Sequence, residues 1–321
     1  MNRRDFLKLS ALAAAAGASG RLAAQGMNAV IPFRTSLKKA LIAKRFDAAL
    51  AQRLKDAGFP GVELSDKTVT VAEARVARRL AEDSGLVIHS FMGGWFEFNS
   101  KDPAKRMASI EEGRKNLRLA KAYGASVMLV VAGRIGGMPM PKPHEFKPEF
   151  DSKSLMLSRA AEGDFPEYVQ AQNDATKYAQ DAVAELAPVA AELGVKIGLE
   201  NVWNNLWVTP DFAAAFIRSF RNPWVKSYLD LGNHVRYAPA EKWVEALSDQ
   251  IVKMHIKDFK VDRAAKNGGA FVRIGDGSID WRRVRRAIDA VGYNGWVSIE
   301  SSGWTDAEHS AIMDKFFNGT L

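Results

Sequence analysis

The chain has 321 residues, of which 47% are hydrophobic, and it carries a formal net charge of +8 at pH 7. This length and apolar content can fill the core of one large domain or two smaller ones, which excludes an intrinsically disordered chain. The absence of cysteine excludes disulfides, thiolate zinc sites and cysteine nucleophiles. After the N-terminal region, no apolar run approaches the roughly 18 residues that a membrane-spanning helix needs.

The first 25 residues predict a twin-arginine export signal. Arg3 and Arg4 begin a basic segment that ends at Lys8, and an alanine-rich apolar stretch follows it. Small residues around Ala24 provide a cleavage site. An alanine-rich first helix is the alternative, but these features occur together in the order of a signal. We therefore expect residues 1–25 to be a signal peptide recognised by the twin-arginine export machinery, and the mature protein to be periplasmic or secreted.

Removing this segment takes away four basic residues and one acidic residue, so the net charge falls from +8 to about +5. The remaining basic residues are scattered along predicted helices, for example at Arg75, Arg78 and Arg79, which is typical of solvated helix faces. We therefore expect no nucleic-acid partner. Proteins exported by the twin-arginine route are often already folded around a cofactor, so a metal can be loaded before export.

Strand and helix patterns alternate along residues 26–321 with short connections. The predicted strands are 37–42, 61–64, 86–89, 126–131, 195–200, 225–230, 251–256 and 296–300. The predicted helices are about 47–57, 71–84, 103–123, 165–193, 209–220, 240–247, 280–291 and 305–317. This alternation implies parallel βαβ units, and it predicts an α/β fold with a single (β/α)8 TIM barrel domain. A doubly wound open sheet is the alternative, but it would place a glycine-rich phosphate turn after an early strand, whereas Gly58-Phe59-Pro60-Gly61 precedes one.

One long segment, at about 133–164, is rich in Gly, Pro and Met and follows the fourth predicted strand. Loops of this length in a compact domain are usually functional lids or binding loops. The segment begins with the flexible sequence Gly136-Gly137-Met138-Pro139. We therefore predict that it forms a lid over the site or a contact in a homo-oligomer.

Four successive predicted strands close on acidic or histidine side chains: Glu200, Asp230, His255 and Glu300. Alone, such an acid more often caps a helix or faces solvent, and such a histidine more often lies in the core. In a parallel barrel, however, the C-terminal strand ends share one face, so the four can converge on one ion. Three oxygen ligands and one imidazole suit Mn²⁺, Mg²⁺, Co²⁺ or Zn²⁺. We predict one divalent metal ion there, with Mn²⁺ favoured by the carboxylate majority.

The motifs around these residues form an ordered set. They are Leu199-Glu200-Asn201, Leu229-Asp230-Leu231-Gly232-Asn233, His255-Ile256-Lys257-Asp258, Ile274-Gly275-Asp276-Gly277-Ser278-Ile279-Asp280-Trp281 and Ser298-Ile299-Glu300. The set resembles the sugar phosphate isomerase/epimerase group of xylose-isomerase-like TIM barrels, from about Leu37 to the end of the chain. The resemblance implies that Glu200, Asp230, His255 and Glu300 are metal ligands, and that Glu200 and Glu300 double as the catalytic acid/base pair.

The same resemblance implies functional groups at earlier strand ends, here Glu63 and His89. Ketohexose epimerases of this group carry a pattern similar to His-x-His at the positions where this chain has Lys253-Met254-His255. They also often carry His at the position of Asn233. Trp203 is either a core residue or a ring that stacks on a sugar face. The predicted substrate-binding residues are Glu63, His89, Asn201, Trp203, Asn233, Lys257 and Arg273.

These residues predict an isomerase or epimerase that acts on a carbohydrate. One carboxylate would remove the proton next to a carbonyl and the other would return it, with the metal stabilising the charge that forms. Export argues for a non-phosphorylated keto sugar, because sugar phosphates are largely kept inside the cell. The same proton abstraction would cleave a 3-keto-glycoside, so a lyase or hydrolase is the alternative, and a non-catalytic sugar-binding barrel is a third. Abasic-site endonucleases share the barrel but need several more histidines for multiple zinc ions.

Overall fold

A computed structural model describes residues 33–321 of the chain, and the predicted signal peptide lies outside these described residues. Within them, Thr35–Leu321 form one compact unit built around a closed barrel of parallel strands. The barrel strands are β1 (Leu37–Ala43), β2 (Gly61–Leu64), β3 (Val87–Trp95), β4 (Val127–Val131), β7 (Lys196–Glu200), β8 (Val225–Asp230), β9 (Ile251–Ile256) and β12 (Gly295–Ile299).

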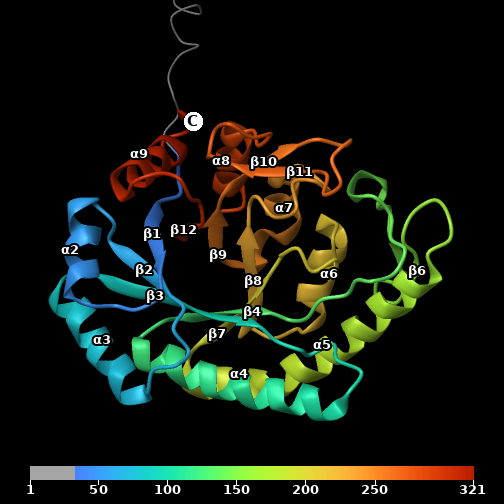
Figure 1. Cartoon of the computed structure of the whole chain (residues 1–321), viewed down its shortest axis with the longest axis horizontal. Coiled ribbons are helices and arrows are strands. Elements are labelled where there is room, and N and C mark those ends of the chain that lie inside the picture. The colour runs from blue at the N-terminus through green and yellow to red at the C-terminus, as the bar shows by residue number, and fades with distance from the viewer. Residues whose placement is uncertain (1–32) are drawn as a thin grey trace, which may run out of the picture. The chain divides into compact units, whose positions relative to one another are not determined.

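The strands pair in the order β1-β12-β9-β8-β7-β4-β3-β2, and the ring closes because β1 pairs with both β2 and β12 (Figure 1). This confirms the predicted (β/α)8 barrel, and the open doubly wound sheet is wrong. In this order β7, β8, β9 and β12 are consecutive neighbours. The four strands that carry the predicted metal ligands therefore form one continuous side of the barrel.

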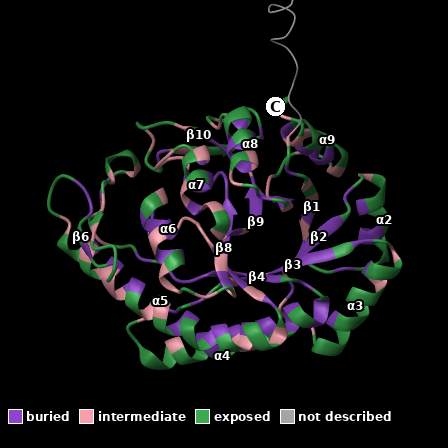
Figure 2. Cartoon of the chain, turned by 180° about the vertical axis from the view of Figure 1, so that it is seen from behind, coloured by how far each residue is buried: buried purple, intermediate pink, exposed green. Residues whose placement is uncertain are grey.

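Helices surround the barrel and connect its strands. In residues 33–321 they are α2 (Ala48–Asp56), α3 (Val71–Asp83), α4 (Pro103–Tyr123), α5 (Pro166–Leu193), α6 (Pro210–Ser219), α7 (Ala240–Leu247), α8 (Trp281–Ala290) and α9 (Asp306–Phe317). Thr70 begins α3 with a capping box to Glu73, and left-handed Gly124 and Gly194 end α4 and α5. Figure 2 shows the helices exposed on their outer faces and the strands largely buried. None of these helices has both the length and the apolar character that crossing a bilayer requires.

Strand β3 is the one barrel strand that differs from its predicted bounds by more than one residue at an end. It continues past His89 to Trp95, through Gly93 and Gly94, where its register against β4 shifts. At Gly93 a Cβ atom would lie 2.8 Å from the carbonyl oxygen of Leu129, so only glycine permits this close approach. Gly93 and Gly94 are therefore part of β3 and do not end it.

Two separate apolar clusters show which way the strand residues point. Val127, Leu129 and Val131 of β4 pack with Tyr228, whereas Met128 belongs to the larger cluster that includes helix residues. Because successive strand residues face opposite sides, the smaller cluster lies inside the barrel and the larger one between strands and helices. The side chain of Tyr228 therefore lies inside the barrel.

The segment 133–164 contains a short hairpin that the sequence did not predict, β5 (Glu149–Phe150) and β6 (Leu157–Arg159). It packs on the outer helices: Asn173 of α5 bonds the backbone of Leu157, and the Phe150 and Phe212 rings lie 4.6 Å apart. None of its residues lines the large cavity described below. Elsewhere in the segment, the carbonyl of Ile135 accepts a hydrogen bond from Nδ2 of Asn205 (2.8 Å), in the loop after β7. A lid and an oligomer contact both stay predictions.

Candidate metal centre

The four predicted metal ligands meet at the C-terminal end of the barrel. Glu200 and Asp230 are the last residues of β7 and β8, His255 lies near the end of β9, and Glu300 follows β12. One potential ligand atom from each lies within 4.8 Å of all the others. The convergence follows from the topology, because parallel strands deliver their C-terminal ends to one face.

The imidazole of His255 lies among the three carboxylates. Its Nδ1 is 3.3 Å from Oε1 of Glu200, 3.3 Å from Oε2 of Glu300 and 3.9 Å from Oδ2 of Asp230. The side chains of His255 and Asp230 are almost completely buried, whereas that of Glu300 is 40% exposed. The cluster is therefore a buried pocket of ligands that opens to solvent on the side of Glu300.

The chemistry of the donors fits a divalent ion. Oδ1 of Asp230 accepts hydrogen bonds from the backbone N–H groups of Gly232 (2.9 Å) and Asn233 (2.6 Å). Oδ2 is buried and accepts no hydrogen bond from the described residues, although Nζ of Lys257 lies 3.3 Å away. A buried carboxylate oxygen without a donor is costly unless a cation satisfies it. Three carboxylates and one imidazole are a possible site for a divalent metal.

The electrostatics of the cluster point the same way. Burial raises the pKa of Asp230 to about 7, which Lys257 opposes and the neighbouring carboxylates of Glu300 and Glu200 reinforce. Burial likewise raises the pKa of Glu200. Glu300 differs: burial would raise its pKa, but hydrogen bonds and charges of His255 and Lys257 outweigh this effect and lower it to about 2. A bound cation would favour the ionised forms of Glu200 and Asp230, which burial and the neighbouring carboxylates oppose.

Glu63, predicted as a substrate-binding residue, lies behind His255 instead. Its side chain is completely buried, and Oε2 accepts hydrogen bonds from Tyr228 (2.6 Å) and Ser298 (3.0 Å). The same oxygen lies 2.8 Å from Nε2 of His255. When Nε2–H donates to Glu63, Nδ1 keeps a free lone pair that faces the other ligands. Glu63 therefore positions the histidine rather than contacting a substrate in the cavity.

Replacing Glu63 by glutamine should weaken Mn²⁺ binding by about 10–100-fold, the typical effect of losing the carboxylate that orients a ligating histidine. A chelator competition titration measures this affinity, and thermal unfolding of the metal-free protein reports any general damage. Ser298→Ala is the matched control, because it removes another donor to the same oxygen and leaves the contact with His255. Equal losses of affinity in both variants, or none in Glu63→Gln, would contradict the assignment.

His89 also lies away from the cavity. It is in the first half of β3, is 2% exposed, and stacks on Trp296 with ring centroids 4.8 Å apart. Its Nε2 is 3.0 Å from Oγ of Ser298, and burial holds its pKa well below the ordinary value, so the ring is neutral. Because β3 continues for several residues beyond it, His89 is not at a strand end, and its predicted contact with substrate is not supported.

Three further predicted substrate-binding residues lie around Asp230. Oδ1 of Asn201 accepts from the backbone N–H of Asp230 (2.7 Å), and Nδ2 donates to its carbonyl (2.8 Å). Nδ2 of Asn233 donates to the carbonyl of Asn201 (3.0 Å), and Nε1 of Trp203 donates to the carbonyl of Asn233 (2.6 Å). These groups connect the loops after β7 and β8 and hold the Asp230 backbone, and none of them lines the large cavity.

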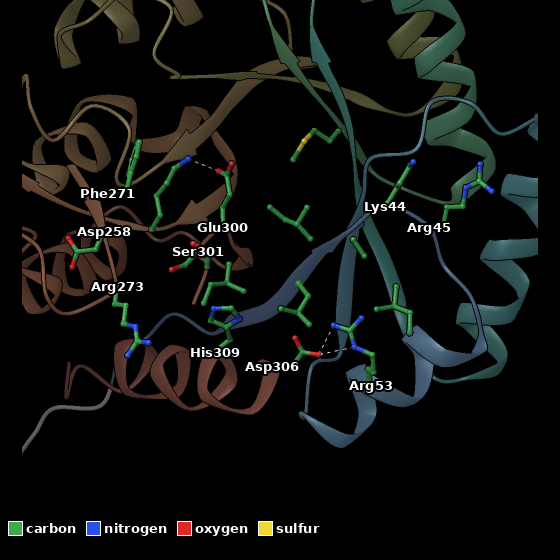
Figure 3. A pocket seen from close by; sticks show the side chains of 18 of the residues that line it. Lys44, Arg45, Arg53, Asp258, Phe271, Arg273, Glu300, Ser301, Asp306 and His309 are labelled. Atoms are coloured by element: carbon green, nitrogen blue, oxygen red, sulfur yellow. Dashed lines mark hydrogen bonds and ion pairs between the residues drawn. The ribbon is translucent and has the colours of Figure 1, made fainter. Parts of the chain in front are cut away.

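The cavity of about 1050 Å³ beside the cluster is lined by the remaining predicted residues, Lys257, Arg273 and Glu300. Nζ of Lys257 donates a 2.7 Å hydrogen bond to Oε2 of Glu300 (Figure 3). Sequence reasoning missed other lining residues, among them Lys44 after β1 and Phe271. Phe271 lies in a hairpin, β10 (Asp258–Val261) and β11 (Gly269–Val272), that has no strong local pattern in the sequence.

Solved structures of other proteins share this fold at low sequence identity. A D-tagatose 3-epimerase-like protein aligns with a TM-score of 0.66 and 17% identity, covering 88% of this chain and 98% of that chain. The 3-keto-D-glucoside 4-epimerase YcjR from E. coli has a TM-score of 0.61 and 16% identity, covering 88% and 99%. A xylose isomerase-like TIM barrel protein from Mycobacterium smegmatis, in complex with magnesium, has a TM-score of 0.59 and 19% identity, covering 90% and 98%.

Sequence comparisons place both parts of the chain. The uncharacterized protein MJ1311 of Methanocaldococcus jannaschii is 27% identical over 141 residues, which are 41% of this chain and 46% of that protein, so the match spans less than half of either. Residues 1–20 match the signal sequence of the twin-arginine translocation pathway, which points to export across the cytoplasmic membrane. Residues 51–314 match the xylose isomerase-like TIM barrel, and the chain therefore belongs to that family.

Proposed function

We propose that the mature protein is a divalent-metal-dependent isomerase or epimerase that acts on a non-phosphorylated keto sugar. The observation that carries this proposal is the cluster of Glu200, Asp230, His255 and Glu300, whose ligand atoms lie within 4.8 Å of one another beside a large cavity. A divalent ion bound there would polarise a carbonyl group and make the proton on the adjacent carbon more acidic.

The side chains of the chain itself would move the proton. Glu200 and Glu300 belong to β7 and β12, with β8 and β9 between them, so they reach a substrate from different sides. One carboxylate can remove the proton next to the carbonyl while the other returns it, which interconverts two sugars. Nζ of Lys257, 2.7 Å from Glu300, supplies a positive charge where the enolate oxygen gains negative charge.

The relatives support the reaction class and the export signal supports the substrate class. Two proteins of similar fold are a D-tagatose 3-epimerase-like protein and a 3-keto-D-glucoside 4-epimerase. A third was solved with magnesium. We favour Mn²⁺ because carboxylate oxygens predominate among the donors, with Co²⁺, Mg²⁺ and Zn²⁺ as alternatives. A periplasmic or secreted protein meets few sugar phosphates, so we propose a neutral keto sugar.

A 3-keto-glycoside lyase is the second candidate, and the size of the cavity favours it. A volume of about 1050 Å³ lies just above the roughly 300–1,000 Å³ typical of ligand pockets, which is more than one monosaccharide fills. In this reaction a carboxylate takes the proton from C2 of a 3-keto sugar, the C2–H electrons form a C1–C2 double bond, and the C1–O bond breaks. The leaving oxygen then receives a proton from the second carboxylate.

Proton NMR in D₂O tests both candidates. The Mn²⁺-loaded protein should introduce deuterium at the carbon next to the carbonyl of a keto sugar or a 3-keto-glycoside, and chelation of the metal should stop it. An isomerase or epimerase returns a labelled sugar, whereas a lyase releases the second sugar or aglycone. Failure of a broad panel of both compound types to exchange a proton would refute the proposed function.

A further inference from the structure

We propose that the β10–β11 hairpin forms a second subsite, in which Phe271 and Arg273 bind a ring that is linked to the sugar at the ligand cluster. The ring is a second sugar or an aryl group, and both present a flat apolar face. This inference rests on the proposed function, because it assumes that the cluster holds the reacting sugar. It adds that the preferred substrate is a glycoside rather than a free monosaccharide.

The position of Phe271 carries the proposal. The side chain is 46% exposed and lines the cavity (Figure 3). Its ring centroid lies 5.2 Å from Nζ of Lys257, and that nitrogen is 2.7 Å from Glu300 and 3.3 Å from Asp230. The side chain of Lys257 therefore contacts both the exposed ring of Phe271 and the ligand cluster. A group attached to a sugar at the cluster would reach the ring directly.

Aromatic neighbours support the ring from behind. The rings of Trp203 and Phe259 lie 5.0 Å and 5.2 Å from that of Phe271. Phe259 is completely buried, so the cluster is attached to the protein core. A single exposed phenylalanine is ordinary on a protein surface, but one that is held by two aromatic rings and faces a cavity suits stacking against a sugar or aryl face.

The hairpin is also held at both of its ends by Asp258. Oδ1 accepts a hydrogen bond from the backbone N–H of Phe259 (2.8 Å), and Oδ2 accepts from Gly275 N–H (2.9 Å), Gly277 N–H (3.2 Å) and Nε1 of Trp281 (3.0 Å). At Gly277 a Cβ atom would lie 1.9 Å from the carboxylate, so this packing requires glycine. Because the hairpin is already held in place, it loses little conformational entropy when a ligand binds.

Arg273 adds polar groups to the proposed subsite. It follows β11 directly, lines the cavity, and donates a 2.9 Å hydrogen bond from one terminal nitrogen to the carbonyl of Gly303. A guanidinium has five N–H donors, so further donors can reach hydroxyl groups on a bound ring. An aromatic face beside a planar donor group is a combination that recognises both faces and edges of a sugar.

Binding of one-ring and two-ring probes to the Mn²⁺-loaded mature protein tests the subsite. Isothermal titration with methyl β-glucoside, phenyl β-glucoside and methyl β-lactoside reports affinity without turnover, because these glycosides have neither a keto group nor a free anomeric carbon. We expect at least one two-ring probe to bind about tenfold more tightly than methyl β-glucoside, and Phe271→Ala to remove that advantage. The tighter of the two identifies the second ring as aryl or sugar.

Trp95→Ala is the matched control, because Trp95 is a 45% exposed aromatic residue at the end of β3 that does not line the cavity. It should leave the affinities within about twofold of the parent values. The subsite is refuted if neither two-ring probe binds measurably better than methyl β-glucoside, or if Trp95→Ala and Phe271→Ala lose affinity equally. Proton exchange is measured separately, so a protein that binds two-ring probes through Phe271 without exchange would refute the proposed reaction and not the subsite.

Discussion

The His255→Ala protein should purify without stoichiometric divalent metal, whereas the parent protein should hold one ion per chain. His255 supplies the nitrogen of the ligand set, and its Nδ1 lies 3.3 Å from both Glu200 and Glu300. Without the ring, the site loses its nitrogen donor. The carboxylates also lose a partner whose positive charge they favour, because against the effect of burial Glu63, Glu200 and Glu300 raise the pKa of His255 well above its ordinary value. Elemental analysis of protein dialysed against a trace of Mn²⁺ gives the metal content directly.

Folding damage must be separated from loss of the ligand, because removing His255 also leaves the buried Glu63 without one of its four hydrogen-bond partners. Glu200→Gln is the second variant, since it keeps the size of the side chain and does not touch Glu63. His144→Ala is the control, because His144 lies in the segment outside the barrel and belongs to no ligand cluster of the described residues. Either cluster variant retaining parental metal content would show that the site is wrong.

The Glu300→Gln protein should lose solvent deuterium exchange by more than the factor of about 10²–10⁴ that removal of one general acid or base typically causes. Glu300 is the partly exposed member of the cluster and lines the cavity, so its carboxylate is the one that a substrate meets first. The loss should exceed that range because the same carboxylate is also a proposed metal ligand. Exchange rates at saturating Mn²⁺ measure the effect.

Metal content must accompany these rates, because a variant that holds parental metal and still fails to exchange identifies Glu300 as the acid or base itself. Glu192→Gln, on the exposed surface of α5, makes the same chemical change away from the barrel mouth and should exchange at the parental rate. If Glu300→Gln exchanges deuterium at the parental rate, Glu300 is not the acid or base that acts together with Glu200. The two-carboxylate mechanism would then be wrong.

The sequence alone determined the barrel and the convergence of the four proposed metal ligands. Alternating strand and helix patterns are local signals, and in a parallel barrel they are sufficient, because every strand must deliver its C-terminal end to the same face. Thus Glu200, Asp230, His255 and Glu300 could be placed together from their positions at strand ends. Helix ends also depend on local signals: the side chain of Thr70 caps the start of α3, and left-handed Gly124 ends α4.

The tertiary structure decided the roles of the other polar residues. Glu63 lies inside the barrel against His255, more than 190 positions away in the chain, and no local pattern reveals such a contact. His89 is predicted at a strand end, whereas β3 continues past it to Trp95 and approaches β4 closely at Gly93. Phe271 lines the cavity from a hairpin that Asp258 ties to Gly275 and Trp281, which are contacts between residues 17 and 23 positions apart. The spacing of hydrophobic residues predicts which face of a helix or strand is buried. Only the tertiary structure shows which side chains of different elements contact one another.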